Sequence, residues 1–343
     1  MPSPFRNFQF IVFPLSMAVM LAGCRTADYY GQAMSGQMEI WRKQVPVEEI
    51  VSTGGEEAEV RRKLVLIQDL RVFATDGLDL PAGDDYTKYA DLGREHVVWN
   101  VIAAPEFSLE SKSYWYPVVG TLEYRGFFKE EDADAFADEL VGQGYDVYVG
   151  GVDAYSTLGW FADPVLNTFM RYTDTELAEL VFHELTHQRL FVSGETAFNE
   201  ALATAVSEEG TRRWLNAIHD TEGLTRYGDR LARKARIYRE IAAARSELKH
   251  LYATPRSEGV MRERKAIVMT DLQDRLRALS EGWGPRMKKA WLERIPNNAI
   301  LNATATYYEY VPRFERMIRE EDGDLDRFFE RVGKLDVDQF LEP

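Results

Sequence analysis

The sequence is short of cysteine, of basic side chains and of long apolar runs, and each shortage excludes a class of protein. Cys24 is the only cysteine in 343 residues, so no internal disulfide can form and a packed apolar core must stabilise the fold. The 41 basic residues against 56 acidic ones give a formal net charge of -15, which excludes a nucleic-acid partner that needs a basic face. The most apolar segment, residues 10–21, contains Pro14 and is too short to span a bilayer.

Residues 1–23 have the organisation of an export signal. Arg6 lies in a short head, the apolar segment follows, and the small residues Ala22 and Gly23 come directly before Cys24. This end resembles the lipobox of bacterial lipoproteins, in which a signal peptidase cuts before the cysteine and the thiol is acylated. The resemblance implies a signal peptide over residues 1–23 and attachment to a membrane through acyl chains on Cys24. The alternative is a secreted protein in which this cysteine has no such role.

Arg25 bears on where such a lipoprotein would reside. In bacterial sorting patterns, aspartate after the acylated cysteine retains the protein at the inner membrane, so by resemblance Arg25 implies the outer membrane, facing the periplasm. An acidic chain is not attracted to an anionic membrane surface, which leaves the acyl chains to supply the attachment.

After the signal, the pattern of apolar residues divides the chain into three regions. The first and last show helical spacing, and the middle one mixes strand-like and helix-like segments. The predicted regions are a mainly helical N-terminal region, 24–110, an α+β region, 111–210, and a helical C-terminal region, 211–343. The predicted fold class is therefore α+β.

The single elements follow from local periodicity. Aromatic and β-branched residues with glycine breaks predict short strands over 113–128, and alternation predicts another over 146–150. Apolar residues at helical spacing predict helices over 29–45, 60–73 and 130–143, and a helical hairpin over 211–280 that is interrupted at 254–259.

Two of the five histidines lie four residues apart in a helical pattern. Side chains at positions i and i+4 of a helix share one face, so His183 and His187 can bind the same ion. Glu184 completes an HExxH motif, in which the glutamate can act as general base toward a metal-activated water. Thr173 and Glu176 form a capping box that predicts where this helix starts. These residues predict a hydrolase with one Zn²⁺ ion, and the alternative is a surface helix with two solvated histidines.

A catalytic zinc ion normally takes a third protein ligand. Leu190 and Ser193 occupy the positions at which a metzincin extension requires glycine and histidine, so that pattern is excluded. A carboxylate is the natural alternative. Glu200 lies on a helix predicted to begin near Thr196, and it is favoured over Glu195, which lies in a turn-like segment.

The surroundings of Glu200 resemble the second active-site helix of the gluzincins, an Asn-Glu pair followed by small residues. The resemblance implies that Glu200 is the third ligand, although the loop between the two helices is short for that superfamily. Gly210 is predicted to break this helix. Glu208 and Glu209, two turns beyond the ligand, are expected to face solvent.

A closer resemblance extends over nearly the whole mature chain. It rests on the lipobox, the HExxH helix and four segments, 89–94, 97–101, 155–161 and 198–206. Together these are similar to the putative lipoprotein aminopeptidases of proteobacteria. The resemblance implies a zincin-like metallopeptidase fold, with a small mixed sheet beside the active-site helices, and zinc-dependent removal of amino-terminal residues from peptide substrates.

Two further parts of the site are expected. The oxyanion needs a donor besides the metal, and Tyr307 is the candidate through its match to an Ala-Thr-Tyr pattern in the resembling family, although a buried core tyrosine is an equal alternative. Peptide substrates commonly bind by adding a strand to a sheet edge. The candidate edge is Tyr155, Ser156, Thr157, Leu158 and Gly159, and an internal strand would show the same pattern.

Other functions remain open at this point. One is a catalytically silent zincin-fold lipoprotein that acts as a binding or assembly module, against which the intact Glu184 argues. Another is a zinc endopeptidase or an amidase, because the motif determines the metal and the water but not the acyl group. The pattern is equally compatible with any oligomeric state.

Overall fold

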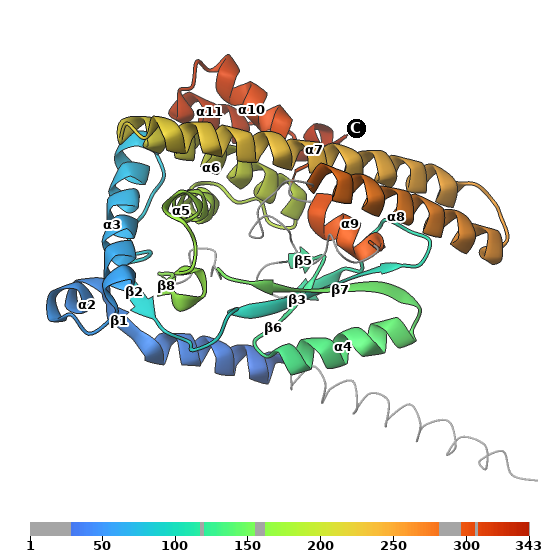
Figure 1. The fold of residues 1–343 in the computed structure, drawn as a ribbon, viewed down its shortest axis with the longest axis horizontal. Coiled ribbons are helices and arrows are strands. Elements are labelled where there is room, and N and C mark those ends of the chain that lie inside the picture. Colours follow the sequence, from blue (N-terminus) through green and yellow to red (C-terminus); the bar gives the residue numbers. More distant parts are fainter. Residues whose placement is uncertain (1–28, 117–119, 155–161, 281–295, 306–307, 343) are drawn as a thin grey trace, which may run out of the picture.

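The computed structural model describes residues 29–116, 120–154, 162–280, 296–305 and 308–342. Figure 1 shows the strands in the middle of the molecule with helices above and below them. The long helices α7 (Thr221–Ala253) and α8 (Glu258–Ser280) cross the top of this view. The helix over residues 29–43 and α4 (Glu130–Gly142) lie along the bottom. Of the helices described, none has the length and apolar character that crossing a membrane requires.

The described strands form three small sheets. One contains β1 (Gln44–Pro46), β2 (Lys88–Ala90) and β8 (Val165–Leu166), with β2 antiparallel to β1 and parallel to β8. A second has the order β6 (Arg125–Phe127), β3 (Val98–Pro105) and β7 (Tyr145–Val152), antiparallel throughout. The third pairs β4 (Tyr114–Tyr116) with β5 (Gly120–Leu122). The predicted α+β class is confirmed, but the strands are divided among several sheets instead of forming one.

The β6-β3-β7 sheet joins segments on both sides of the predicted boundary at residue 110. Its central strand β3 precedes that boundary, while β6 and β7 follow it, and β3 pairs with β7 from Val98 opposite Val152 to Pro105 opposite Tyr145. Helix α4 covers one face through Ala133, Ala137 and Leu140, as Figure 1 shows below the sheet. The region 24–110 thus contributes the middle of a sheet as well as helices.

The remaining helices enclose the largest core. They are the helix over 29–43, α2 (Val47–Thr53), α3 (Ala58–Leu78), α5 (Asp174–Arg189), α6 (Thr196–Ala217), α10 (Val311–Glu320) and α11 (Leu325–Val332). The 3-10 turn η1 (Asn167–Phe169) and the short helix α12 (Val337–Leu341) complete this part. Fully buried phenylalanines fill its interior: Phe169, Phe182, Phe198, Phe314 and Phe328. Burial of these large side chains is the main stabilising term in a chain without disulfides.

Gly210 is not the helix break that was predicted. Helix α6 passes through it and continues to Ala217. A Cβ atom at this position would lie 2.7 Å from Leu78 Cδ1 and 3.0 Å from Phe182 Cδ2, closer than side chains pack. The glycine is therefore explained by the close packing of α3 and α5 against α6, and this tertiary contact overrides the low helix propensity of glycine.

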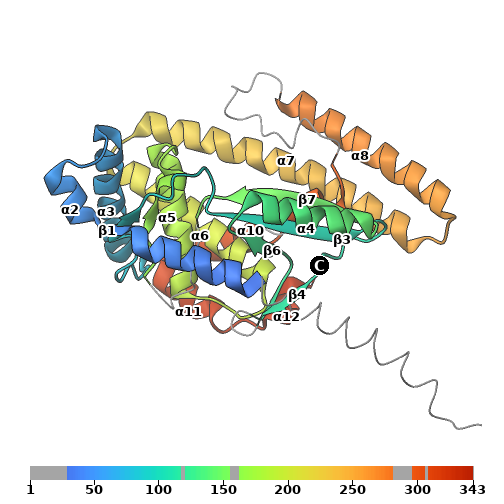
Figure 2. The ribbon, with the colours of Figure 1, turned by 90° about the horizontal axis from the view of Figure 1, so that it is seen from below.

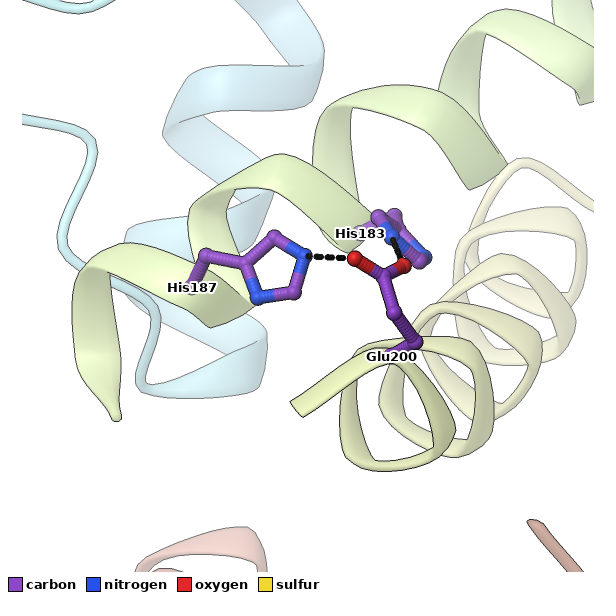
Figure 3. A group of neighbouring side chains, drawn as sticks. All are labelled: His183, His187 and Glu200. Atoms are coloured by element: carbon purple, nitrogen blue, oxygen red, sulfur yellow. Dashed lines mark hydrogen bonds and ion pairs between the residues drawn. The ribbon is translucent and has the colours of Figure 1, made fainter. Parts of the chain in front are cut away.

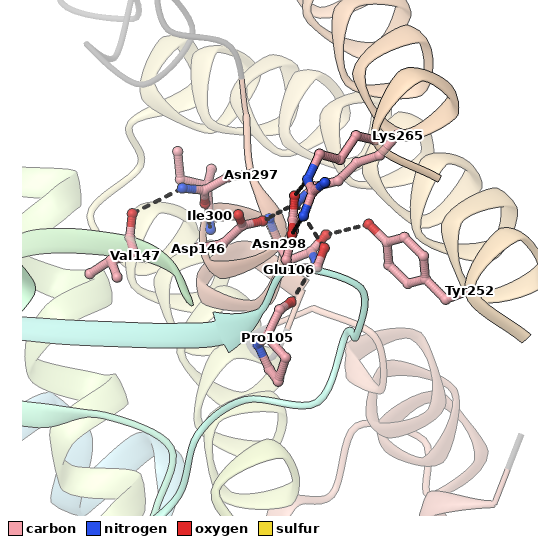
Figure 4. Close-up of polar contacts among 10 residues, drawn as sticks. Pro105, Glu106, Asp146, Val147, Tyr252, Lys265, Asn297, Asn298 and Ile300 are labelled. Atoms are coloured by element: carbon pink, nitrogen blue, oxygen red, sulfur yellow. Dashed lines mark hydrogen bonds and ion pairs between the residues drawn. The ribbon is translucent and has the colours of Figure 1, made fainter. Parts of the chain in front are cut away.

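The predicted helical hairpin is confirmed as α7 and α8, except that it starts at Thr221, because residues 211–217 continue α6. A polar cluster joins the hairpin to the sheet (Figure 4). Asn298, fully buried at the start of α9 (Asn298–Ala305), donates from Nδ2 to the carbonyls of Pro105 and Glu106 at 3.0 Å each. Its Oδ1 accepts from Tyr252 on α7 at 2.9 Å. Lys265 on α8 forms a 2.6 Å ion pair with Asp146 of β7. These contacts connect α7, α8 and α9 to one end of the β6-β3-β7 sheet. Figure 2 shows the hairpin extending along the sheet.

Candidate metal centre

Helix α5 presents the HExxH motif because its start and its buried face are both well defined. Thr173 Oγ1 accepts from the backbone of Glu176, whose carboxylate accepts from the Thr173 backbone at 2.8 Å, so the predicted capping box is confirmed. The apolar side is fully buried through Leu177, Ala178, Val181, Phe182 and Leu185. This packing determines the rotation of the helix and directs His183 and His187 toward α6.

A buried asparagine shapes the turn between α5 and α6. Asn199 Nδ2 donates to the carbonyl of Val192 at 2.7 Å, and Asn199 Oδ1 accepts from the backbone of Val192 at 2.8 Å. Gly194, with φ of +87°, allows the tight reversal. The asparagine next to the candidate ligand Glu200 thus holds the loop that brings α6 back against α5, and the short loop is sufficient for this.

Figure 3 shows His183, His187 and Glu200 pointing toward one another from the two helices. His183 Nε2 lies 3.2 Å from Glu200 Oε2, and His187 Nε2 lies 3.8 Å from Glu200 Oε1. One possible ligand atom from each residue lies within 4.8 Å of the others. Two ligands about 2.1 Å from a tetrahedral ion are about 3.4 Å apart, so the three donors fit one ion with little movement. Glu195, the competing ligand, is not in this group.

Burial and mutual charge shift the pKa values of all three candidate ligands. Burial alone would lower the pKa of His183, but the hydrogen bond and charge of Glu200 raise it above its usual value. Burial lowers the pKa of His187 to about 4, so this imidazole is neutral at physiological pH. Burial opposes ionisation of Glu200, but the two histidines hold its pKa below its usual value. A carboxylate and a neutral imidazole are the protonation states that bind metals, so Glu200 and His187 are already in the binding form, whereas His183 must give up its proton when an ion binds.

Glu184 faces a more acidic neighbourhood than the ligands do. Burial raises its pKa to about 7; His183 acts in the opposite direction, and the charges of Glu200, Asp163 and Asp85 add to the rise. Asp85 and Asp163 are both buried, and Asp85 Oδ1 accepts from the Asp163 backbone at 2.7 Å. The glutamate between the two histidines can therefore gain and lose a proton near neutral pH.

Sequence reasoning missed a buried ion pair on the same side of α6. Glu208, expected in solvent, has a side chain only 1% exposed, and its Oε1 lies 2.9 Å from Lys234 Nζ on α7. Glu209, also expected in solvent, is half-buried and is paired with Arg212 and Arg213 at 2.8 Å each. The sequence signal that could have indicated the burial of Glu208 is its spacing of eight residues, about two helical turns, from Glu200.

Lys234 connects this pair to the candidate metal ligands. Its charge is among the influences that lower the pKa of His183, and its Nζ lies 5.4 Å from the ring centre of Tyr308. Tyr308 stacks on Tyr238 with ring centres 4.0 Å apart. The pKa of Lys234 is raised because the charge of Glu208 outweighs burial, so the lysine keeps its positive charge beside the candidate ligands.

A hollow opens beside the first turn of α6. It is lined by polar side chains together with two apolar ones: Asn100, Ile102, Ser111, Glu123, Tyr124, Thr196, Asn302 and Ala303. Thr196 precedes Glu200 by one helical turn, a rise of about 6 Å along the axis. The hollow therefore contains hydrogen-bonding groups and one carboxylate, and it reaches α6 one turn before Glu200.

Several predicted residues lie outside the described part of the chain. These are Cys24, Tyr307 and the proposed edge strand, Tyr155, Ser156, Thr157, Leu158 and Gly159. Their predicted roles stay predictions. The described neighbours are β7, which ends at Val152, and Tyr308.

Comparison with known proteins identifies the family. A family model described as "Putative aminopeptidase" matches residues 28–340, so the chain belongs to the putative aminopeptidase family. No curated protein and no solved structure matches the chain. The match includes α5 and α6 with all three candidate ligands, and the family name suggests a peptidase.

Proposed function

We propose that this chain is a zinc-dependent aminopeptidase whose single ion is held by His183, His187 and Glu200. The observation that carries the proposal is the convergence of two imidazoles and one carboxylate, which bring one possible ligand atom each to within 4.8 Å of the others. This is an ordinary ligand set for a catalytic zinc ion that keeps a fourth position open. The family name supports peptide bonds as the target.

The proposed chemistry assigns the proton transfers to Glu184. Zinc, when bound, supplies Lewis acidity toward a water and toward the scissile carbonyl. Glu184 accepts the proton of the attacking water and passes it to the leaving amine, and its pKa of about 7 without the ion suits both transfers. Tyr307 is the proposed donor to the oxyanion, and residues 155–159 are the proposed strand against which the peptide lies.

The proposal also includes the location of the enzyme. Cys24 is acylated, and the chain acts on peptides from the periplasmic face of the outer membrane. Mass spectrometry of protein extracted from membranes is expected to find an amino-terminal peptide that begins with acylated Cys24. An intact signal or an unmodified cysteine would refute this part alone.

Hydrolysis of a matched pair of peptides, one free and one N-acetylated, tests the activity. The chain from residue 25 onward is expected to cleave the free peptide, to leave the acetylated one intact, and to lose activity with a chelator. Glu184→Gln is expected to lower kcat by about 100-fold or more without loss of zinc. Glu222→Gln, at a side chain 87% exposed on α7, is the matched control and should be unchanged.

The outcomes separate the alternatives. Equal cleavage of both peptides would replace the aminopeptidase with an endopeptidase. Hydrolysis of non-peptide amides, with neither peptide cleaved, would indicate an amidase. Bound zinc without hydrolysis of any substrate would favour the silent binding module, and full activity of Glu184→Gln would refute the proposed role of this residue.

A further inference from the structure

The helix over residues 29–43 has two apolar faces, one buried and one substantially exposed. Gly36 and Ile40 lie on the buried face, where Phe128 closes against Gly36. On another face, side chains spaced four, four and three residues apart form a stripe. This stripe, called the outer stripe, consists of Tyr30, Met34, Met38 and Trp41, which are 40%, 66%, 46% and 42% exposed.

The composition of the outer stripe is typical of the membrane interface. Tyrosine and tryptophan are enriched where one end of a side chain is in lipid and the other in water, and methionine adapts its shape to irregular apolar surroundings. A contiguous apolar stripe on an exposed helix is a feature of interaction surfaces, whereas single exposed apolar residues are ordinary. Arg42 and Lys43, both exposed at the end of the helix, border it.

The position of the helix in the chain indicates what the outer stripe contacts. The described part of the helix starts at residue 29, and residues 25–28 lie between it and Cys24 in the sequence. Five steps between successive Cα atoms lead from Cys24 to residue 29, and even fully extended they span at most about 18 Å. If Cys24 is acylated, as proposed above, the first turn of the helix cannot lie farther than this from the lipid surface.

We propose that the helix over residues 29–43 lies on the bilayer surface, with the outer stripe inserted among the lipid headgroups and upper acyl chains. It acts as a second membrane contact beside the acyl anchor, and because the chain is acidic, the contact depends on apolar burial. In Figure 1 this helix lies along the bottom and α7 across the top, and Figure 2, seen from below, shows it in front. Contact through this face directs the α7-α8 hairpin away from the bilayer.

Vesicle binding by the non-acylated chain from residue 25 onward tests the inference. This chain keeps every described element and lacks the anchor, so the result depends neither on acylation nor on peptidase activity. Vesicles of phosphatidylethanolamine and phosphatidylglycerol with brominated acyl chains serve as the probe. We expect binding with quenching of tryptophan fluorescence. Met34→Ser with Met38→Ser should weaken partitioning by about tenfold.

Two variants make the test specific. Trp41→Phe should still bind but should lose most of the quenching. Val65→Ser with Val72→Ser removes two apolar side chains, 44% and 60% exposed, from α3, and it should bind as the unmodified chain does. Circular dichroism confirms that each variant is folded. Absence of vesicle binding, equal binding by the methionine variant, or unchanged quenching after Trp41→Phe would overturn the inference. So would a dimer in sedimentation that the methionine changes dissociate, because the stripe would then contact a second copy.

Discussion

Replacing Lys234 by methionine should destabilise the protein far more than removing an ordinary surface lysine. The change keeps an unbranched apolar stem but leaves Glu208, with a side chain only 1% exposed, without its partner at 2.9 Å. Loss of one member of a buried ion pair costs about 3–5 kcal/mol, because the remaining charge stays in a medium that solvates it poorly. Since Lys234 itself is 27% exposed, the lower end, about 3 kcal/mol, is expected.

The reverse change should cost less. After Glu208→Gln, Lys234 can still approach Glu179, whose Oε1 is 3.9 Å away, and water. A loss of about 1 kcal/mol is expected. The asymmetry between the two single changes follows from their unequal exposure.

Thermal and urea unfolding measure these differences. Lys334→Met is the matched control, because Lys334 and Glu330 form an exposed pair, 77% and 66%, worth about 0.5 kcal/mol or less. Lys234→Met should lower Tm by about 6 °C or more, and the control by about 1 °C. If the two lysine variants fall within about 1 kcal/mol of each other, the pair is not the buried interaction described above.

Three further outcomes are expected. Gly210→Ala should destabilise by about 1–3 kcal/mol, because its Cβ would meet Leu78 and Phe182, whereas Gly228→Ala, with open space around it, should be neutral or stabilising when both are compared by urea unfolding. In the metal-free chain, the free energy of unfolding should fall by about 1 kcal/mol as pH rises from 6.5 through about 7, because the folded state holds a proton on Glu184 that the unfolded state has released. The raised pKa of His183 acts in the same direction. Comparison with the melting curves of Glu184→Gln therefore isolates the contribution of the glutamate. Glu200→Gln, which replaces the anionic ligand by a neutral amide, should weaken zinc binding by about 100-fold or more in a competition titration, and unchanged affinity would remove this residue from the ligand set.

The parts of the site that sequence predicted are those governed by local geometry. Helical periodicity alone places His183 and His187 on one face, and the capping box at Thr173 is a contact within four residues. Glu200 could be predicted because a short loop, the six residues 190–195, leaves few ways for the second helix to pack against the first, and the carboxylate then meets the histidines. The strands after residue 113 could also be predicted from the sequence, because aromatic and β-branched residues there are interrupted by glycines.

The errors concern residues whose surroundings come from distant parts of the chain. Gly210 has the local signature of a helix end, and the reason for a glycine inside α6 is the approach of Leu78 from α3 and of Phe182 from α5. Glu208 looks solvent-exposed in its own helix, but α7 crosses it and supplies Lys234 from 26 positions away. The division into several sheets depends on long-range pairing, as between Val98 and Val152, which short-range patterns do not encode.

X-ray absorption at the zinc K-edge, on the zinc-loaded chain after dialysis, tests the central claim most directly. The account predicts one zinc per chain, with two imidazole ligands and oxygen ligands at about 2.0–2.1 Å. It also predicts loss of the imidazole signature in a folded His183→Ala and His187→Ala double variant. Zinc that dialyses away, or an ion bound without imidazole ligands, would contradict the assignment of His183, His187 and Glu200 as the metal site.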